Sequence, residues 1–171
     1  MNLSFSSQIT KGQVFEAVAD HLRSLNLNIV NLDDNRPWGG FFVIEEKEAG
    51  KFINIFFPEL EEKDILQGNK LSPKILIVAP GKRLSWQYHH RRAELWKLIG
   101  GRAGVGISDT DEEKETIYLA PGDITRLKQG ERHRLIGLDE WGIVAEIWQH
   151  TDAQDPSDEN DIIRLQDDFG R

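Results

Sequence analysis

The 171-residue sequence contains no cysteine. Without thiols the chain cannot form disulfides, bind a metal through thiolates or use a Cys nucleophile. It also lacks a long apolar run, since none approaches the roughly 20 residues of a membrane-spanning helix. The N-terminal residues show no basic segment followed by an apolar stretch, so no signal peptide is expected. These features predict a cytoplasmic protein with no membrane partner.

Positive charge is in the minority. The chain has 21 Lys and Arg against 29 Asp and Glu, for a formal net charge of -8. A broad nucleic-acid surface is therefore not expected. An anionic small ligand is still compatible, because a local cluster of Arg and Lys can oppose the net charge. The length and the 39% apolar content suit one soluble domain with a hydrophobic core.

Residues 10–25 are predicted to form an amphipathic helix. Thr10 and Gln13 have the spacing of a capping box. Apolar residues then follow at helical spacing, namely Val14, Val18, Leu22 and Leu25. The helix is expected to end at Asn26-Leu27-Asn28. Residues 29–40 are expected to be a connector.

From Phe41 onward, short apolar runs alternate with turn residues, which predicts β-structure. The expected strands cover residues 41–46, 52–57, 75–79, 84–90, 95–99, 103–108, 115–120, 124–127, 133–138 and 142–149. Turns are expected at Ala49-Gly50, Pro80-Gly81 and Gly100-Gly101, and residues 58–73 are expected to be a charged loop. Many short strands at this spacing favour a sandwich or barrel, such as a jelly roll.

The stretch from Gly81 to Gly101 holds three residues of metal-binding type within eight positions: Gln87, His89 and Glu94. On a strand, Gln87 and His89 point to the same face. His133 is the candidate for a fourth ligand. An amide oxygen, two imidazoles and a carboxylate suit one divalent ion, and do not distinguish Zn, Mn, Fe, Co and Ni. The set leaves positions open to water or substrate, as a catalytic metal requires.

Two further histidines have a different interpretation. His90 is expected on the face opposite to His89, because side chains alternate along a strand. His150 follows the last predicted strand and is expected to be exposed.

The spacing of these residues resembles the two sequence motifs of cupins. Gly81, Gln87, His89, Glu94 and Gly101 match the first motif, with Gln in place of the usual first His. Gly122, Lys128, Gly130, His133 and Gly137 match the second, with Lys128 where Pro is usual and Gly137 where Asn is usual. The resemblance implies a mainly β fold, the double-stranded β-helix or jelly-roll barrel, with a metal held by Gln87, His89, Glu94 and His133.

Further matches resemble, more specifically, the type II mannose-6-phosphate isomerase domain, which occurs alone or fused to a guanylyltransferase. They are Arg36-Pro37-Trp38-Gly39, Leu84-Ser85-Trp86-Gln87, Arg92-Ala93-Glu94 with Trp96, and Asp161-Ile162-Ile163-Arg164-Leu165 with Gly170-Arg171. Arg91 stands where that family often has His. The resemblance covers roughly residues 36–46 and 72–171. It implies an N-terminal helical extension over residues 1–35 and a cupin domain with a C-terminal tail over residues 36–171.

This resemblance implies a metal-dependent aldose–ketose isomerase of a sugar phosphate. Arg92, in the matched Arg-Ala-Glu, and Arg164, in the matched tail, are then expected to bind the substrate, because Arg binds phosphate bidentately. A general base other than the ligand Glu94 is needed. The candidates are Lys97, Glu146 and Gln149.

Two other functions are compatible with the same motifs. One is a non-catalytic cupin that binds a sugar or a sugar nucleotide. The other is a cupin isomerase or epimerase of an unphosphorylated sugar, whose activity would be indifferent to phosphate and to Arg92→Ala. Cupins commonly pair through strands, so a homodimer is compatible with either function.

Overall fold

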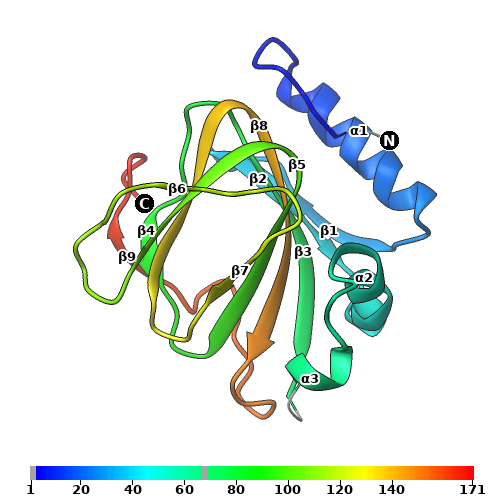
Figure 1. Ribbon diagram of the computed structural model, residues 1–171, viewed down its shortest axis with the longest axis vertical. Coiled ribbons are helices and arrows are strands. Elements are labelled where there is room, and N and C mark those ends of the chain that lie inside the picture. The colour runs from blue at the N-terminus through cyan, green and yellow to red at the C-terminus, as the bar shows by residue number, and fades with distance from the viewer. Residues whose placement is uncertain (1–2, 67–68) are drawn as a thin grey trace.

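The computed structural model describes residues 3–66 and 69–171 (Figure 1). Its helices are α1 (Lys11–Ser24), the 3-10 helix η1 (Glu46–Glu48), α2 (Ala49–Phe56) and α3 (Glu62–Leu66). Its strands are β1 (Ile29–Asp33), β2 (Gly39–Ile44), β3 (Leu71–Val78), β4 (Trp86–Tyr88), β5 (Arg92–Ser108), β6 (Ile117–Tyr118), β7 (Ile124–Leu127), β8 (Arg132–His150) and β9 (Ile163–Gln166). Within the described residues, all nine strands join one antiparallel sheet. The fold is therefore mainly β with an N-terminal helix, as predicted.

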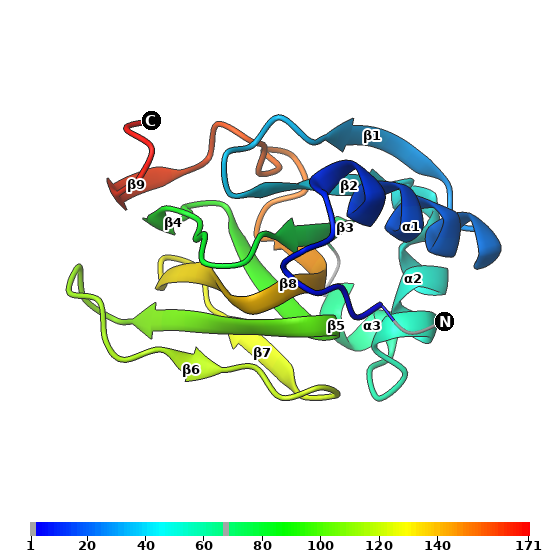
Figure 2. The ribbon, with the colours of Figure 1, turned by 90° about the horizontal axis from the view of Figure 1, so that it is seen from above.

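Two long strands, β5 with 17 residues and β8 with 19, organise the sheet. They pair antiparallel from Arg92 opposite His150 to Ser108 opposite Arg132. The second edge of β8 pairs with β3 and, at His133, with β4. The second edge of β5 pairs with β6 and β7. Both long strands bend, so the sheet curls round an interior, and the helices lie outside it (Figures 1 and 2).

The turn predicted at Gly100-Gly101 is wrong, because β5 runs through these residues with two shifts of register. The shifts lie between Leu98 and Gly100 and between Gly101 and Ala103. Gly101 has a φ of 61°. A Cβ atom there would lie 1.7 Å from the Trp141 carbonyl oxygen, so only Gly fits. The strands predicted at 95–99 and 103–108 are one strand, and so are those predicted at 133–138 and 142–149.

The strand predicted at residues 52–57 is also wrong, since helix α2 occupies this segment. The buried residues of α2 are Ala49, Phe52, Ile53 and Phe56. These positions repeat with a helical period, although the residues themselves favour β-structure. Two smaller corrections concern predicted irregular segments. The expected connector at 29–40 contains β1, and the expected loop at 58–73 contains α3 and the start of β3.

The central strand β3 is buried on both faces. Along β3, Ile75 and Ile77 pack in an outer hydrophobic cluster, while Leu76 and Val78 pack in an inner one. Helix α1 buries Leu22 in the outer cluster, and Thr10 and Gln13 form the predicted capping box at its start. The helices thus cover the outside of the sheet and leave its interior to the second cluster and to the polar residues described below.

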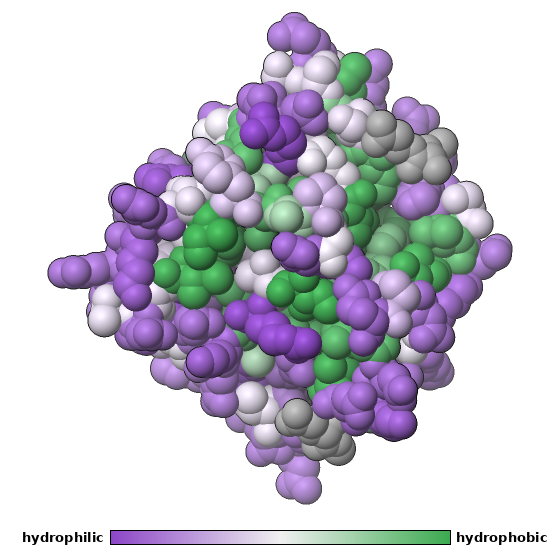
Figure 3. All heavy atoms as spheres, in the orientation of Figure 1, coloured by the Kyte–Doolittle hydropathy of each residue, from purple (hydrophilic) through white to green (hydrophobic). Residues whose placement is uncertain are grey.

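The surface carries scattered apolar side chains. The large exposed ones are Val30, Leu32, Ile117, Tyr118, Ile163 and Leu165. Figure 3 shows apolar surface in separate areas divided by hydrophilic side chains. None of the helices in residues 3–66 and 69–171 is long and apolar enough to cross a membrane.

Candidate metal centre

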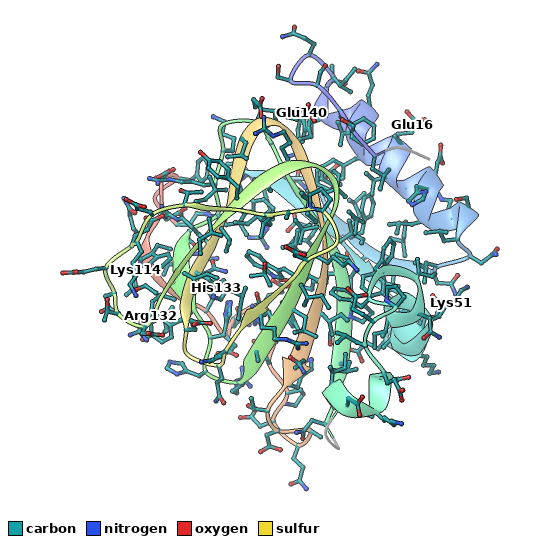
Figure 4. All side chains as sticks on the ribbon, viewed as in Figure 1. Glu16, Lys51, Lys114, Arg132, His133 and Glu140 are labelled. Atoms are coloured by element: carbon teal, nitrogen blue, oxygen red, sulfur yellow. The ribbon has the colours of Figure 1, made fainter. Side chains whose placement is uncertain are left out.

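Three of the four predicted ligands lie together inside the curved sheet. Each of His89, Glu94 and His133 offers a ligand atom, and these atoms all lie within 4.8 Å of one another. All three side chains are buried. His89 follows β4, Glu94 is near the start of β5, and His133 is near the start of β8. Figure 4 shows His133 in the interior and Arg132 on the outside of the same strand.

Hydrogen bonds orient both imidazoles. The Nδ1 atom of His89 lies 2.6 Å from the Asp161 carbonyl oxygen, and that of His133 lies 2.9 Å from the Glu131 carbonyl oxygen. A carbonyl only accepts, so each Nδ1 carries a proton, and each Nε2 presents a lone pair to the cluster when its ring is neutral. The two Nε2 atoms each lie 3.3 Å from a different carboxylate oxygen of Glu94.

The donor set fits a cation. Within the described residues, the buried Nε2 of His133 has no hydrogen-bond partner, although it faces a carboxylate. Two imidazole nitrogens and a carboxylate that converge suit a divalent ion, and the Arg92 guanidinium, which donates to Glu94 Oε1 and lies 3.1 Å from His89 Nε2, borders the same atoms. Carbonyl groups that hold the far ring nitrogens are typical of metal-binding histidines. The residues of the cluster therefore fit a divalent metal ion.

Burial and charge set the protonation of the cluster. Burial lowers the pKa of His89 to about 3, so its imidazole is neutral at neutral pH. Burial acts against the charged form of Glu94. The neighbouring Arg92 and the two imidazoles outweigh this effect of burial and hold the pKa of Glu94 well below its usual range. Both protonation states are those that metal binding requires.

Gln87, the fourth predicted ligand, lies beside the cluster with its amide turned. Its Nε2 atom is 3.5 Å from His89 Nε2, and its Oε1 atom accepts a hydrogen bond of 2.5 Å from Ser85 Oγ. A half-turn of the amide would point its oxygen at the cluster. Ser85 Oγ could then accept from the amide nitrogen instead.

Arg92 is buried and its guanidinium is engaged on several sides. It donates to Glu94 Oε1 (2.7 Å), Ser157 Oγ (2.8 Å) and the carbonyl oxygens of Asp158 (3.2 Å) and Asp161 (3.4 Å), and it lies 3.1 Å from His89 Nε2. It also stacks 3.6 Å from the ring centroid of Trp148. Arg92 thus joins Glu94 to the segment that follows β8.

A cavity opens beside the cluster. Arg92 and Arg164, the two predicted substrate-binding residues, both line it. Arg164 lies on β9, directly opposite Gln87 in the pairing with β4. Three tryptophans also line the cavity, namely Trp38, Trp96 and Trp148. The site therefore combines polar groups with aromatic walls.

Lys74 also lies in the wall of this cavity, and the sequence analysis did not predict it. Its side chain is buried and forms an ion pair with Glu159. Its ammonium lies 3.6 Å from the centroid of the Trp148 ring. The available signal was a lone lysine immediately before the apolar run of residues 75–78.

Of the three candidates for a general base, Glu146 lines the cavity. Its carboxylate accepts a hydrogen bond of 2.9 Å from the indole nitrogen of Trp96. Burial, together with the charge of Glu94, raises the pKa of Glu146 to about 8. This carboxyl group is therefore protonated at neutral pH.

The other two candidates for the base have partners away from the cavity. Lys97 forms an ion pair of 2.6 Å with Glu59. Gln149 donates to the Ile65 carbonyl oxygen at 3.0 Å. Neither is among the residues that line the cavity.

The two remaining histidine predictions have different outcomes. His90 is exposed, as expected. His150 is not exposed, so that prediction is wrong. Its ring lies 2.7 Å from Ser72 Oγ and accepts the Ser157 backbone N–H at 2.9 Å. The segment after β8 folds back over the end of the strand and buries it, which lowers the pKa of His150 to about 4.

A curved antiparallel sheet with histidines and a carboxylate directed inward is the arrangement of a cupin-type domain. In agreement, a mutant of Bacillus subtilis oxalate decarboxylase OxdC is similar in structure, with a TM-score of 0.55 over 79% of this chain and 30% of that chain. At 17% sequence identity, this is a similarity of fold alone.

The chain belongs to the mannose-6-phosphate isomerase C-terminal family, whose model matches residues 45–167. It is 36% identical to the alginate biosynthesis protein AlgA of Pseudomonas aeruginosa over 126 residues, 72% of this chain and 24% of the relative. It is 28% identical to the xanthan biosynthesis protein XanB of Xanthomonas campestris over 138 residues, 80% of this chain and 23% of the relative. The chain thus spans about a quarter of the length of these curated relatives.

Proposed function

We propose that this chain is a metal-dependent aldose–ketose isomerase of a phosphorylated sugar, built on the cupin double-stranded β-helix. The observation that supports this most directly is the position of Glu146, a carboxyl group with a raised pKa, in the same cavity wall as Glu94. The family name indicates mannose 6-phosphate as the first substrate to test. The relatives named for alginate and xanthan biosynthesis support a role in carbohydrate metabolism.

Isomerisation moves a proton from the carbon beside the carbonyl group to the carbonyl carbon itself, through an ene-diolate, while a second proton moves between the two oxygens. The reaction needs a base within hydrogen-bonding reach of the carbon-bound proton and stabilisation of the negative charge that develops on the substrate oxygens. A divalent ion held by His89, Glu94 and His133, with the Gln87 amide oxygen as a fourth ligand, would supply this stabilisation as a Lewis acid.

Glu146 is our choice for the proton-transfer group. A pKa of about 8 lets the carboxyl group both accept and return a proton near neutral pH. The indole N–H of Trp96 fixes the orientation of the carboxyl group. Glu94 is unsuited to this role, because Arg92 and the two imidazoles keep it ionised and occupied.

The test is an assay of mannose 6-phosphate conversion to fructose 6-phosphate. The protein is stripped of metal with a chelator and reloaded with Zn, Mn, Co, Ni or Fe in turn. We expect activity with at least one ion and none after stripping. Glu146→Gln should lower kcat by about 10²- to 10⁴-fold, the usual contribution of general acid–base catalysis, and leave metal content unchanged.

One outcome would overturn the proposal, and two others would redirect it. Lack of turnover with every ion and every sugar phosphate would overturn it. Binding of a sugar or sugar nucleotide without turnover would instead support the non-catalytic function. Equal activity toward mannose and mannose 6-phosphate would support an enzyme that acts on unphosphorylated sugars.

A further inference from the structure

The cavity beside the metal cluster is rich in positive charge. Five cationic side chains line it against three acidic ones, although the whole chain has a net charge of -8. The cationic residues are Arg36, Lys74, Arg92, Arg164 and Arg171. The cavity is therefore suited to an anion.

Two of the five cations are already occupied by the protein. Arg92 is buried among Glu94, Ser157 and backbone carbonyl groups. Lys74 is buried and paired with Glu159. These two side chains have few donors left for a ligand.

The other three are guanidinium groups from separate parts of the chain. Arg36 lies between β1 and β2, Arg164 on β9, and Arg171 beyond β9. Asp33 holds Arg36 at 2.7 Å, and Asp167 holds Arg171 at 2.8 Å. These aspartates fix two of the guanidinium groups in place.

Arg164 differs from these two because it has no ion pair within the described residues. Burial lowers its pKa, and the positive charges of Arg171 and Arg36 add to that effect. Three like charges thus act on one another across a small space. Asp167 and Glu159 offset part of this repulsion, and an anion bound at Arg164 would offset more of it.

The position of Arg164 relates this group to the metal cluster. Arg164 lies directly opposite Gln87, and opposed residues in an antiparallel pair share one face of the sheet. A ligand held at Arg164 is therefore one strand away from the predicted metal ligands and within the same cavity. A sugar phosphate could place its phosphate at the arginines and its carbonyl end toward the cluster.

We propose that Arg36, Arg164 and Arg171 form the subsite for the phosphate group of the substrate. Phosphate offers three acceptor oxygens, and guanidinium groups bind it bidentately. In this arrangement Arg92 is a positioning residue that holds Glu94. The inference rests on the proposed function for the identity of the ligand as a sugar phosphate, but the anion subsite can be measured without turnover.

The experiment is calorimetric titration of the metal-loaded full chain with mannose 6-phosphate and with inorganic phosphate. The variants are Arg164→Ala, Arg171→Ala and Arg164→Lys. Arg102→Ala is the matched control, because Arg102 is exposed, pairs with Asp139 and lies outside the cavity. Metal content and circular dichroism verify that each variant is folded.

We expect wild-type protein to bind both ligands, with inorganic phosphate competing against mannose 6-phosphate. Each Arg→Ala change should weaken both affinities by about ten- to a hundredfold, the loss expected for a charge-assisted hydrogen bond. Arg164→Lys should recover part of the loss, because lysine restores the charge but not bidentate geometry. Arg102→Ala should bind like wild type.

The outcomes separate this inference from the isomerase proposal. Phosphate binding that Arg164→Ala and Arg171→Ala weaken, in a protein without turnover, would keep the subsite and remove the isomerase. Turnover whose KM is unchanged in both variants would keep the isomerase and overturn the subsite. Wild-type protein that binds neither phosphate compound would also overturn it.

Discussion

His133 Nε2 and Glu94 Oε2 face each other at 3.3 Å, buried and without a hydrogen bond between them. The proton of the imidazole lies on the far ring nitrogen, which is held by the Glu131 carbonyl group. A neutral lone pair against an ionised carboxylate is unfavourable in a buried site. A cation bound between these atoms would convert the same geometry into a stabilising one.

Removal of this imidazole should therefore abolish tight metal binding. We expect His133→Ala to weaken binding of a divalent ion by about 10³-fold or more. Loss of a residue that only hydrogen-bonds to a metal ligand typically costs about 10- to 100-fold, and loss of a ligand itself should cost more. Competition with a chromophoric chelator measures the affinity. His90→Ala is the control, because His90 is exposed and should not alter it. Unchanged affinity in His133→Ala would remove His133 from the metal site.

Arg92 should matter to the fold as well as to the site. Arg92→Met leaves Glu94 as a buried carboxylate without its guanidinium partner and frees the segment that carries Ser157. Loss of one partner of a buried pair costs about 3–5 kcal/mol of unfolding free energy. Urea denaturation of metal-free protein measures this loss.

The neighbouring Arg91→Ala provides the matched control for Arg92→Met. Arg91 pairs with the exposed Asp155 and Asp158 and, at 4.0 Å, lies against the buried Asp161, so its loss should cost about 1 kcal/mol, well below the effect of Arg92→Met. Equal effects of the two changes would show that the buried contacts of Arg92 contribute little to stability.

Local signals in the sequence were sufficient for the elements whose partners lie nearby. The capping box of Thr10 and Gln13 predicted the start of α1. The spacing of His89 and Glu94 in the first motif, with His133 from the second, predicted three residues that the fold brings within reach of one another. Helix α2 was missed because its residues favour β-structure, while only the period of its buried positions is helical.

Other features depend on contacts between distant segments, which no local pattern encodes. Lys74 enters the cavity because β3 pairs with β8, which places Lys74 opposite Glu146. His150 is buried because the polar segment after β8 returns to it through Ser157. Arg92 was expected to bind substrate; it lines the cavity, and contacts of its guanidinium with the same segment could not be foreseen. A single sequence predicts the residue types of this site better than the partners that each residue finds.

Glu146 should make stability depend on pH. Its pKa is 4.5 in ordinary surroundings and about 8 in the folded protein, so the folded state holds this proton more tightly. Its contribution is fully present below pH 4.5 and is lost as the pH rises to about 8. The slope expected between these limits is about 1 kcal/mol per pH unit.

Glu146→Gln should change the slope by about 1 kcal/mol per pH unit relative to wild type, because the amide resembles the protonated acid and does not titrate. Below pH 6.5, His89 and His150, whose pKa values are lowered to about 3 and about 4, add a slope of opposite sign that is common to both proteins. Urea denaturation of metal-free protein at pH 5, 6 and 7 measures the slope in each protein. Glu16→Gln, on the exposed face of α1, is the control and should keep the wild-type slope. Equal slopes in wild type and Glu146→Gln would assign the pH dependence to other groups.

Helix α1 should share the stability of the sheet rather than form an independent extension. Leu22 is fully buried in the cluster that also contains Ile77 of β3. Leu22→Ala should therefore lower the unfolding free energy of the whole domain by about 2–5 kcal/mol. All five tryptophans lie between residues 38 and 148, so their fluorescence reports mainly on the sheet, although the indole of Trp141 also donates to the Ile9 carbonyl oxygen. We expect the urea midpoint of tryptophan fluorescence to fall together with that of helical circular dichroism.

Arg23→Ala, at an exposed ion pair with Asp20, should leave both midpoints nearly unchanged. A fluorescence midpoint that Leu22→Ala does not shift would instead establish residues 1–35 as a separate unit.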